Sequence, residues 1–220
     1  MLKLGDISAV IFDMDGLVLD TERTYLIAWQ QAAETMGFAP PAAFWQSLSG
    51  LGGKDIMLKL AAAGGEGFDL PHFNQLCGSY WREYVQEHGI ALRRGVLELL
   101  DYLLEQGLPY GLATNSPAAN AHECLRLAGI SEAFALVVTR DDVLLPKPSP
   151  DLFLNAAERL QVPVAQCLVL EDSHTGIVAA HQAGARSVLV PSAASVDPLT
   201  LALCDGVADD LLQVLALLKL

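Results

Sequence analysis

The sequence has few positive charges. Its 220 residues include 13 lysines and arginines but 26 aspartates and glutamates, which gives a formal net charge of −13. Nucleic acids and anionic membrane surfaces bind proteins through basic patches, so this balance argues against both kinds of partner. It does not exclude small phosphorylated substrates, because the local field of a site can oppose the net charge.

Cysteines and long apolar runs are also scarce. The four cysteines form no C-x-x-C pair and have no close histidine partner, which favours reduced, mostly buried thiols over disulfides or a zinc site. No apolar run approaches the roughly 18 residues of a membrane span, and the first residues lack the apolar core of a signal peptide. We therefore expect a cytoplasmic protein without a membrane partner.

Apolar residues make up 52% of the chain, enough for one large domain or for a core with a smaller module. Between residues 20 and 90 the apolar spacing predicts helices at 22–37, 42–48, 54–63 and 71–87, and no convincing strand. After residue 95, strands at 109–113, 135–138, 167–170 and 186–190 alternate with helices at 96–106, 117–128, 150–160, 174–183 and 209–218. This alternation predicts an α/β fold, a doubly wound parallel sheet with a small α-helical insertion.

The most informative segment is VIFDMDG at residues 10–16. It is typical of a buried strand that ends in two aspartates, and Asp13 and Asp15 share one side of the strand while the chain stays extended. Gly16 then permits a sharp exit. Two such carboxylates repel one another unless a cation or a shared proton intervenes, which suggests a metal-assisted site. A strand end followed by a polar turn is the alternative that this pair alone leaves open.

Polar side chains follow other predicted strands as well. The sequence Thr114-Asn115-Ser116-Pro117 follows the strand at 109–113, and Glu171-Asp172 follows the strand at 167–170. Lys147 lies between these two segments, flanked by prolines. Because parallel strands bring their carboxyl ends to one edge of the sheet, we expect all of these groups to meet there.

The residue types at this edge suit phosphoryl transfer. Asp13 can attack phosphorus or bind Mg²⁺, and the carboxylates of Glu171 and Asp172 add further hard ligands. Thr114 offers a hydroxyl, the helix that starts at Pro117 offers an N-terminus of the kind that binds phosphate, and Lys147 can pair with phosphate and with a carboxylate. Such catalysis consists largely of positioning and charge neutralisation.

Each residue also has a plainer interpretation when it is taken alone. Thr114 or Ser116 could cap the following helix, and Lys147 could be a solvated loop charge. Glu171 and Asp172 could simply be acidic residues at the N-terminus of the next helix, where the helix dipole favours negative charge. Because all of these groups occur together, in this order and at the ends of these strands, we favour a functional site over the separate alternatives.

With these motifs the chain resembles the haloacid dehalogenase (HAD) superfamily, in its phosphatase and β-phosphoglucomutase-like branch with a helical cap. Asp13-Met-Asp-Gly matches the first motif, Thr114-Asn-Ser the second, Lys147-Pro the third and Glu171-Asp172 the fourth. The resemblance spans nearly the whole chain. It implies a Rossmann-like core domain at 1–19 and 91–220 and a cap domain at 20–90.

The resemblance also implies a role for each motif residue. Asp13 would become an aspartyl-phosphate, and Asp15 would protonate the leaving oxygen and then activate water. Thr114, the Asn115 amide and Lys147 would bind the phosphoryl group. Mg²⁺ would bind Asp13, the Asp15 carbonyl and Asp172, with Glu171 bound directly or through water. An aspartate at position 15 argues against dehalogenase activity, since the dehalogenases of the family lack it.

The predicted cap departs from the mutase pattern. In β-phosphoglucomutases a hinge histidine follows the second aspartate by ten positions, whereas this chain has Tyr25. Those mutases carry a substrate-binding arginine in a cap loop, but the aligned stretch 48–54 offers only Lys54 as a replacement. This glycine-rich stretch fits neither nucleotide-binding fingerprint. Four further residues could either contribute to the site or be polar residues without a role in it: Arg82, Arg93, Arg94 and His174.

We therefore expect a magnesium-dependent phosphatase that acts on a small phosphate monoester, a sugar or polyol phosphate, as a monomer or weak dimer. A phosphomutase of the β-phosphoglucomutase type is the alternative enzyme. A non-catalytic phosphometabolite-binding protein is the alternative from another class, and it is disfavoured because Asp13, Asp15, Lys147 and Asp172 are all present.

Overall fold

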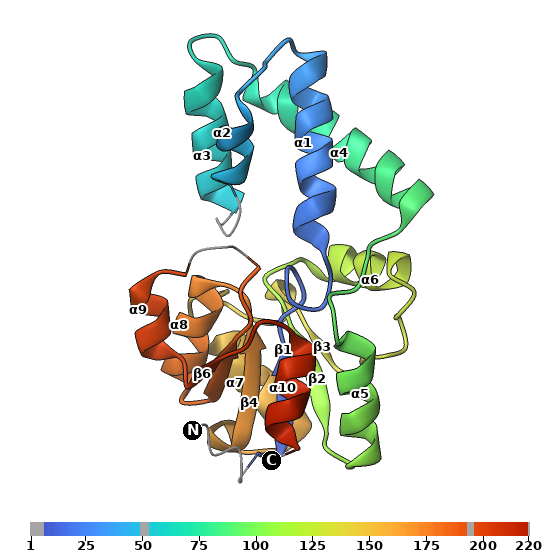
Figure 1. The fold of residues 1–220 in the computed structure, drawn as a ribbon, viewed down its shortest axis with the longest axis vertical. Coiled ribbons are helices and arrows are strands. Elements are labelled where there is room, and N and C mark those ends of the chain that lie inside the picture. Colours follow the sequence, from blue (N-terminus) through green and yellow to red (C-terminus); the bar gives the residue numbers. More distant parts are fainter. Residues whose placement is uncertain (1–6, 49–52, 193–195, 220) are drawn as a thin grey trace. The chain divides into compact units, whose positions relative to one another are not determined.

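The structure is a computed structural model that describes residues 7–48, 53–192 and 196–219. The chain forms two compact units, of which the first comprises Met1–Asp20 and Ala91–Leu220 and the second Thr21–Ile90. Figure 1 shows a sheet covered by helices in the first unit and helices alone in the second. Asp20, assigned by sequence to the helical part, belongs to the first unit, where its amide donates to the Ala91 carbonyl at 2.9 Å.

The first unit is built on a six-stranded sheet in which all neighbours are parallel, in the order β3-β2-β1-β4-β5-β6. Both β1 and β4 are buried along their whole length, which is why they read as continuous apolar runs. The strands are β1 (Ala9–Phe12), β2 (Tyr110–Ala113), β3 (Val137–Val138), β4 (Cys167–Glu171), β5 (Arg186–Leu189) and β6 (Gly206–Val207). This confirms the predicted α/β class. The two-residue β6 was not predicted, because so short a strand has no readable period.

Helices connect these strands. They are α5 (Val96–Glu105), α6 (Ala118–Leu127), α7 (Asp151–Leu160), α8 (His174–Ala183), α9 (Pro198–Leu203) and α10 (Leu211–Leu218), with 3₁₀ turns η1 (Arg140–Asp142) and η2 (Val164–Gln166). The turns and the six-residue α9 were not predicted, since they are too short to show helical periodicity. None of the helices in the described parts of the chain has the length and apolarity that crossing a membrane requires.

One face of the sheet is covered by α7 and α8. The β1 side chains of Ala9 and Ile11 point to this face and pack with Phe153 of α7 and Ala180 of α8 in one buried cluster. By the alternation of a strand, Val10 and Phe12 point to the other face. On that side the rings of Phe12, Tyr110 and Phe134 make edge-to-face contacts. The central strand therefore contributes to the core on both faces.

The strand order places a topological switch point between β1 and β4. The chain leaves β1 toward β2 on one side and leaves β4 toward β5 on the other, so the connections diverge between these two strands. Open parallel sheets bind ligands at such points, beyond the carboxyl ends of the strands. The Asp13 amide donates to the Leu170 carbonyl at 3.0 Å, which extends the ladder by one residue. The first aspartate is thus fixed in the frame of the sheet.

The second unit contains α1 (Thr21–Thr35), α2 (Ala42–Gln46), α3 (Gly53–Gly64) and α4 (Leu70–His88), and its described residues include no strand. The four helices match the predicted ones within a few residues. At the start of α4 the Asp69 side chain accepts a hydrogen bond from the His72 amide, and Pro71 stands in the first turn. Both are typical helix-start residues, so this boundary was readable from the sequence.

Aromatic residues join α1 to α4. The Tyr25 ring stacks on Trp29 and on Trp81, with ring planes inclined by 20° and 11°. The indole N–H of Trp81 donates to the buried Thr24 hydroxyl at 2.9 Å. This contact satisfies a buried polar group that has left water, which is how a tryptophan fits a helix–helix interface.

Replacing Thr24 with alanine should lower the free energy of unfolding by about 1–3 kcal/mol, because the buried indole N–H loses its acceptor. Urea denaturation followed by tryptophan fluorescence measures this, since all three tryptophans belong to the helical unit. Ser79→Ala is the matched control, as it removes an exposed hydroxyl of α4 that bonds to the Gln75 carbonyl. Equal stabilities of the two variants would contradict the assignment.

The four cysteines are free thiols, which confirms the prediction. Burial raises the pKa of Cys77 and Cys124 to about 12 and that of Cys167 to about 11. At pH 8 only about one Cys167 thiol in a thousand is then ionised, and the thiolate is the reactive form. Brief iodoacetamide treatment of the native protein should label the half-buried Cys204 first, as seen by peptide mass spectrometry, and labelling in urea should be uniform. Early labelling of Cys77 would contradict this order.

Candidate active site

The predicted site residues converge at the carboxyl edge of the sheet. Asp13 follows β1, Thr114 follows β2, and Glu171 is the last residue of β4. These three strands are neighbours in the sheet. Lys147 enters the same place from the loop between η1 and α7. The structure thus brings together segments that lie more than 100 residues apart in the sequence.

Lys147 is buried at the centre of the site. Its Nζ donates to Asp13 Oδ1, to Glu171 Oε1 at 2.7 Å and to the Ala113 carbonyl at 2.8 Å. The Phe153 ring lies 4.7 Å from the same nitrogen, at a cation–π distance. Burial by itself would lower the pKa of Lys147, but the carboxylates of Asp13 and Glu171 outweigh it and raise the pKa above its usual value. A solvated loop charge, the alternative interpretation, is therefore wrong.

Asp13 lies among charges of its own sign. Burial raises the pKa of its carboxyl well above the usual value, Lys147 opposes this shift, and Glu171, Asp172 and Asp15 add to it. One oxygen from each of Asp13, Glu171 and Asp172 lies within 4.8 Å of the other two. Four carboxylates around one lysine leave an excess of negative charge. Such a cluster of hard oxygen donors is suited to a divalent cation.

Glu171 is fully buried and both of its carboxylate oxygens are occupied. Oε1 accepts from Lys147, and Oε2 accepts from the Ser173 amide at 3.0 Å and the Ser173 hydroxyl at 2.9 Å. Ser173 also caps α8 by accepting from the Gly176 amide. Glu171 therefore points to Lys147, and the interpretation that it only decorates the helix start is wrong. Sequence reasoning gave Ser173 no role, although a serine before a helix is a readable capping signal.

Two glycines make room for these carboxylates. A Cβ on Gly176 would overlap the Glu171 carboxylate, and a Cβ on Gly16 would overlap that of Asp172. Gly16 also has a φ of +88°, a backbone conformation that residues with a side chain rarely adopt. The predicted sharp exit at Gly16 is therefore confirmed, and the close approach of Asp172 adds a second reason for glycine there.

Asp15 has neighbours of a different kind. Its Oδ2 accepts from the Ser116 hydroxyl at 2.9 Å and from the Thr114 hydroxyl at 3.3 Å. Its Oδ1 is buried and has no hydrogen-bond partner in the described part of the chain. The two aspartates are thus distinguished by their surroundings, since Asp13 bonds to a cation and Asp15 to neutral hydroxyls.

Two main-chain amides at the start of α6 already have side-chain acceptors, which the sequence did not predict. The Ala118 amide donates to Asp141 Oδ2 at 2.8 Å, and the Ser116 amide donates to the Thr114 hydroxyl at 3.0 Å. Neither Thr114 nor Ser116 caps this helix, whose N-cap residue is Pro117. The capping role that the sequence suggested for them belongs to Asp141, which lies 23 residues after Ala118 and carries no local signal.

Asn115 binds the loop of Lys147 through its side chain. Its Nδ2 donates to the Lys147 carbonyl at 3.1 Å, and the Lys147 amide donates to Asn115 Oδ1 at 2.8 Å. This reciprocal pair fixes the main chain on both sides of the lysine. The side chain of Asn115 therefore positions Lys147 and leaves only its main-chain amide for a ligand.

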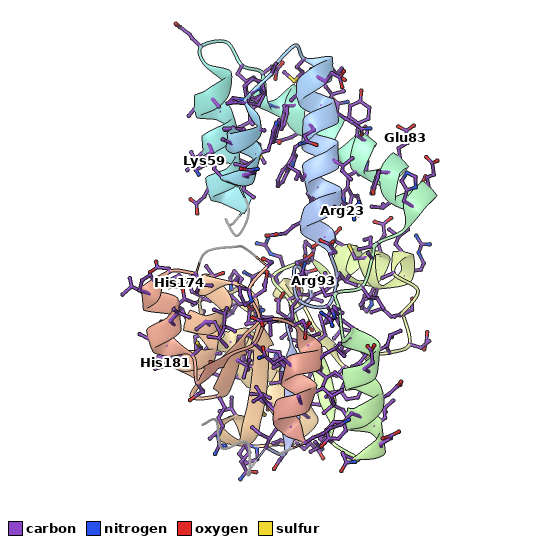
Figure 2. The ribbon with its side chains drawn as sticks, viewed as in Figure 1. Arg23, Lys59, Glu83, Arg93, His174 and His181 are labelled. Atoms are coloured by element: carbon purple, nitrogen blue, oxygen red, sulfur yellow. The ribbon has the colours of Figure 1, made fainter. Side chains whose placement is uncertain are left out.

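The remaining candidates have other surroundings or lie outside the described residues. The side chain of Lys54 and residues 49–52 are outside the described residues. Arg94 forms an exposed ion pair with Asp210, at 3.1 Å. Arg93 lines a groove of about 440 Å³ beside the linker at Ala91. His174, at the start of α8, shares a 2.7 Å hydrogen bond with Thr200 of α9; Figure 2 labels Arg93 and His174.

Fold and site together define an α/β protein with a lysine–carboxylate centre, suited to a divalent cation, at the switch point of its sheet. The chain belongs to the haloacid dehalogenase-like hydrolase family, which it matches over residues 10–190. This confirms the family predicted from the motifs.

Individual relatives agree with that assignment. The phosphorylated carbohydrates phosphatase of Thermotoga maritima is 31% identical over 180 residues, which cover 82% of this chain and 83% of that protein. The beta-phosphoglucomutase of Bacillus subtilis is 28% identical over 188 residues, which cover 82% and 81%. A HAD family hydrolase of Deinococcus radiodurans, solved with bound phosphate and sodium, has a TM-score of 0.81 at 26% identity, with coverage of 97% and 95%. The phosphatase supports the expected class, a phosphoric monoester hydrolase.

Replacing Gly176 with alanine should lower the free energy of unfolding by about 1–3 kcal/mol, because the new Cβ must displace the buried Glu171 carboxylate. Differential scanning calorimetry measures the change. Gly78→Ala is the matched control, since position 78 lies within α4 with almost nothing near its Cβ, and alanine there should be neutral or stabilising. A Gly176 variant as stable as this control would contradict the packing described.

Proposed function

We propose that this protein is a magnesium-dependent phosphatase that hydrolyses a small phosphate monoester, of a sugar or polyol, through an aspartyl-phosphate on Asp13. The observation that carries the proposal is the buried Lys147, which is bonded to both Asp13 and Glu171. A lysine held there can neutralise a phosphoryl group beside a carboxylate nucleophile. The phosphatase relative acts on phosphorylated carbohydrates, which supports the same substrate class.

The acidic cluster fits Mg²⁺. Its three carboxylates, two of which are buried, outnumber Lys147, and Mg²⁺ prefers carboxylate oxygen and water. Asp13, Asp172 and the main-chain carbonyl of Asp15 would hold the ion, with Glu171 reaching it directly or through water. When bound, the ion would offset the negative charge of these carboxylates and the charge that develops on the phosphoryl oxygens.

The phosphoryl group would be bound by three donors of the core. These are Lys147 Nζ, the Thr114 hydroxyl and the main-chain amide of Asn115. The Lys147 ammonium opposes the effect of burial on the pKa of Asp13 and so favours the ionised carboxylate, which is the nucleophilic form. The Asn115 side chain contributes indirectly, because it fixes the main chain that carries Lys147.

In the first step, a carboxylate oxygen of Asp13 bonds to phosphorus while the ester P–O bond breaks, and Asp15 gives its proton to the leaving oxygen. In the second, Asp15 takes a proton from a water molecule that attacks phosphorus, which releases phosphate and restores Asp13. Oδ1 of Asp15 supports this exchange, since it has no hydrogen-bond partner in the described residues and no donor has to be displaced before it takes part in proton transfer.

The helical unit Thr21–Ile90 would act as the cap. It joins the core through two linkers whose core ends lie side by side, because the Asp20 amide bonds to the Ala91 carbonyl. Such paired linkers suit a hinge, and a closing cap would keep bulk water from the aspartyl-phosphate. Lys54 of this unit remains our candidate for a substrate contact.

Asp13→Asn should lower kcat by about 1,000-fold or more, because an amide oxygen is a poor nucleophile, and EDTA should abolish the wild-type activity until Mg²⁺ is restored. The measurement is phosphate release from a panel of sugar, polyol and short-acid phosphates. Asp101→Asn, the same change at an exposed position of α5, is the control and should retain activity. No turnover by the wild type on any member of the panel would refute the proposal.

A phosphomutase of the β-phosphoglucomutase type is a second candidate, supported by the Bacillus subtilis relative. It would use the same Asp13 chemistry but return the phosphoryl group to a second sugar hydroxyl. Incubation with β-glucose 1-phosphate and a hexose bisphosphate activator separates the two functions. A phosphatase forms inorganic phosphate, whereas a mutase forms glucose 6-phosphate at constant phosphate.

A further inference from the structure

We propose that Ser116 is the positioning residue of Asp15, and that its hydroxyl makes Oδ1 the oxygen through which Asp15 exchanges protons. This inference rests on the proposed phosphatase function and extends it. It concerns a residue for which the sequence indicated only a capping role or a main-chain amide.

The hydrogen bonds of Asp15 are one-sided. Both hydroxyl donors reach Oδ2, and the bond from Ser116 is the shorter, at 2.9 Å against 3.3 Å from Thr114. The shorter distance is near the usual value for O–H···O bonds, and the longer one is beyond it. Oδ1 is buried and has no partner in the described residues. A carboxylate that is bonded through one oxygen cannot rotate freely, so the bonds to Oδ2 also fix the position of Oδ1.

Thr114 cannot hold Asp15 while it binds substrate. A hydroxyl has a single proton to donate. If the Thr114 hydroxyl donates to a phosphoryl oxygen, as proposed, it no longer donates to Asp15 Oδ2. Ser116 is then the remaining donor to this oxygen during the reaction.

Ser116 itself is anchored independently of its hydroxyl. Its amide donates to Thr114 Oγ1 at 3.0 Å, and its carbonyl accepts from the Arg140 amide at 3.3 Å. Pro117 follows it directly and restricts the backbone. Ser116→Ala should therefore keep the loop in place and remove only the bond to Asp15.

The test compares two esters that differ in their need for an acid. Benzyl phosphate releases an alkoxide that must be protonated as the P–O bond breaks, whereas 4-nitrophenyl phosphate releases a stable anion. The constant kcat/KM covers the steps up to departure of the alcohol. Loss of Ser116 should therefore lower kcat/KM for benzyl phosphate by about 10–100-fold and for 4-nitrophenyl phosphate by less than about 3-fold.

Three further variants make the comparison specific. Ser116→Thr keeps a hydroxyl and should restore most of the benzyl phosphate activity. Ser116→Cys keeps the size of the side chain, but its thiol is a weak donor. It should therefore show the same selective loss as Ser116→Ala, and it tests the lost hydrogen bond should the smaller alanine impair folding. Ser8→Ala removes an exposed hydroxyl that bonds to Gln166 before β1, at the opposite edge of the sheet, and should change neither constant.

The outcomes separate the inference from the function on which it rests. A wild type that hydrolyses neither ester overturns the proposed function and the inference with it. An active wild type whose two kcat/KM values fall equally in Ser116→Ala overturns the inference alone, because the hydroxyl then serves the phosphate loop. A selective loss with benzyl phosphate, restored by threonine, establishes it.

Discussion

The ammonium group of Lys147 is the interaction on which the site depends. Its bonds to Asp13, Glu171 and the Ala113 carbonyl join the ends of β1, β2 and β4 at one buried point. A buried charge is stable only when it is paired and hydrogen-bonded, and the carboxylates around this lysine would repel one another without it. The same group therefore stabilises the edge of the sheet and lies beside the carboxylate that we propose as the nucleophile.

The surrounding structure can be understood as support for this centre. Asn115 fixes the main chain of Lys147 from one side, and Ser173 holds the far oxygen of Glu171 from the other. Gly176 leaves space for the Glu171 carboxylate. Because each contact uses a different segment of the chain, the charged groups are held from several sides.

The two aspartates of the first motif have identical side chains, but their different neighbours suit them to different roles. Asp13 is bonded to a cation and lies within an acidic cluster, so it suits a nucleophile and metal ligand. Asp15 is held by hydroxyls through one oxygen, so it suits proton transfer through the other. Both aspartates follow the end of β1, and only their neighbours distinguish them.

The sequence by itself determined the parallel sheet, the helical insertion, the family and the motif residues that meet at the strand ends. These follow from local periodicity and from the rule that parallel strands align their carboxyl ends. Only the tertiary structure decided which hydrogen bonds those residues make. It assigned Ser116 to Asp15, Asp141 to the start of α6 and Ser173 to Glu171. The first two join residues more than 20 positions apart, and a hydrophobic pattern records only which face is buried, so it cannot predict such partners. Short elements such as β6 and α9 were missed because they contain too few residues to show a period.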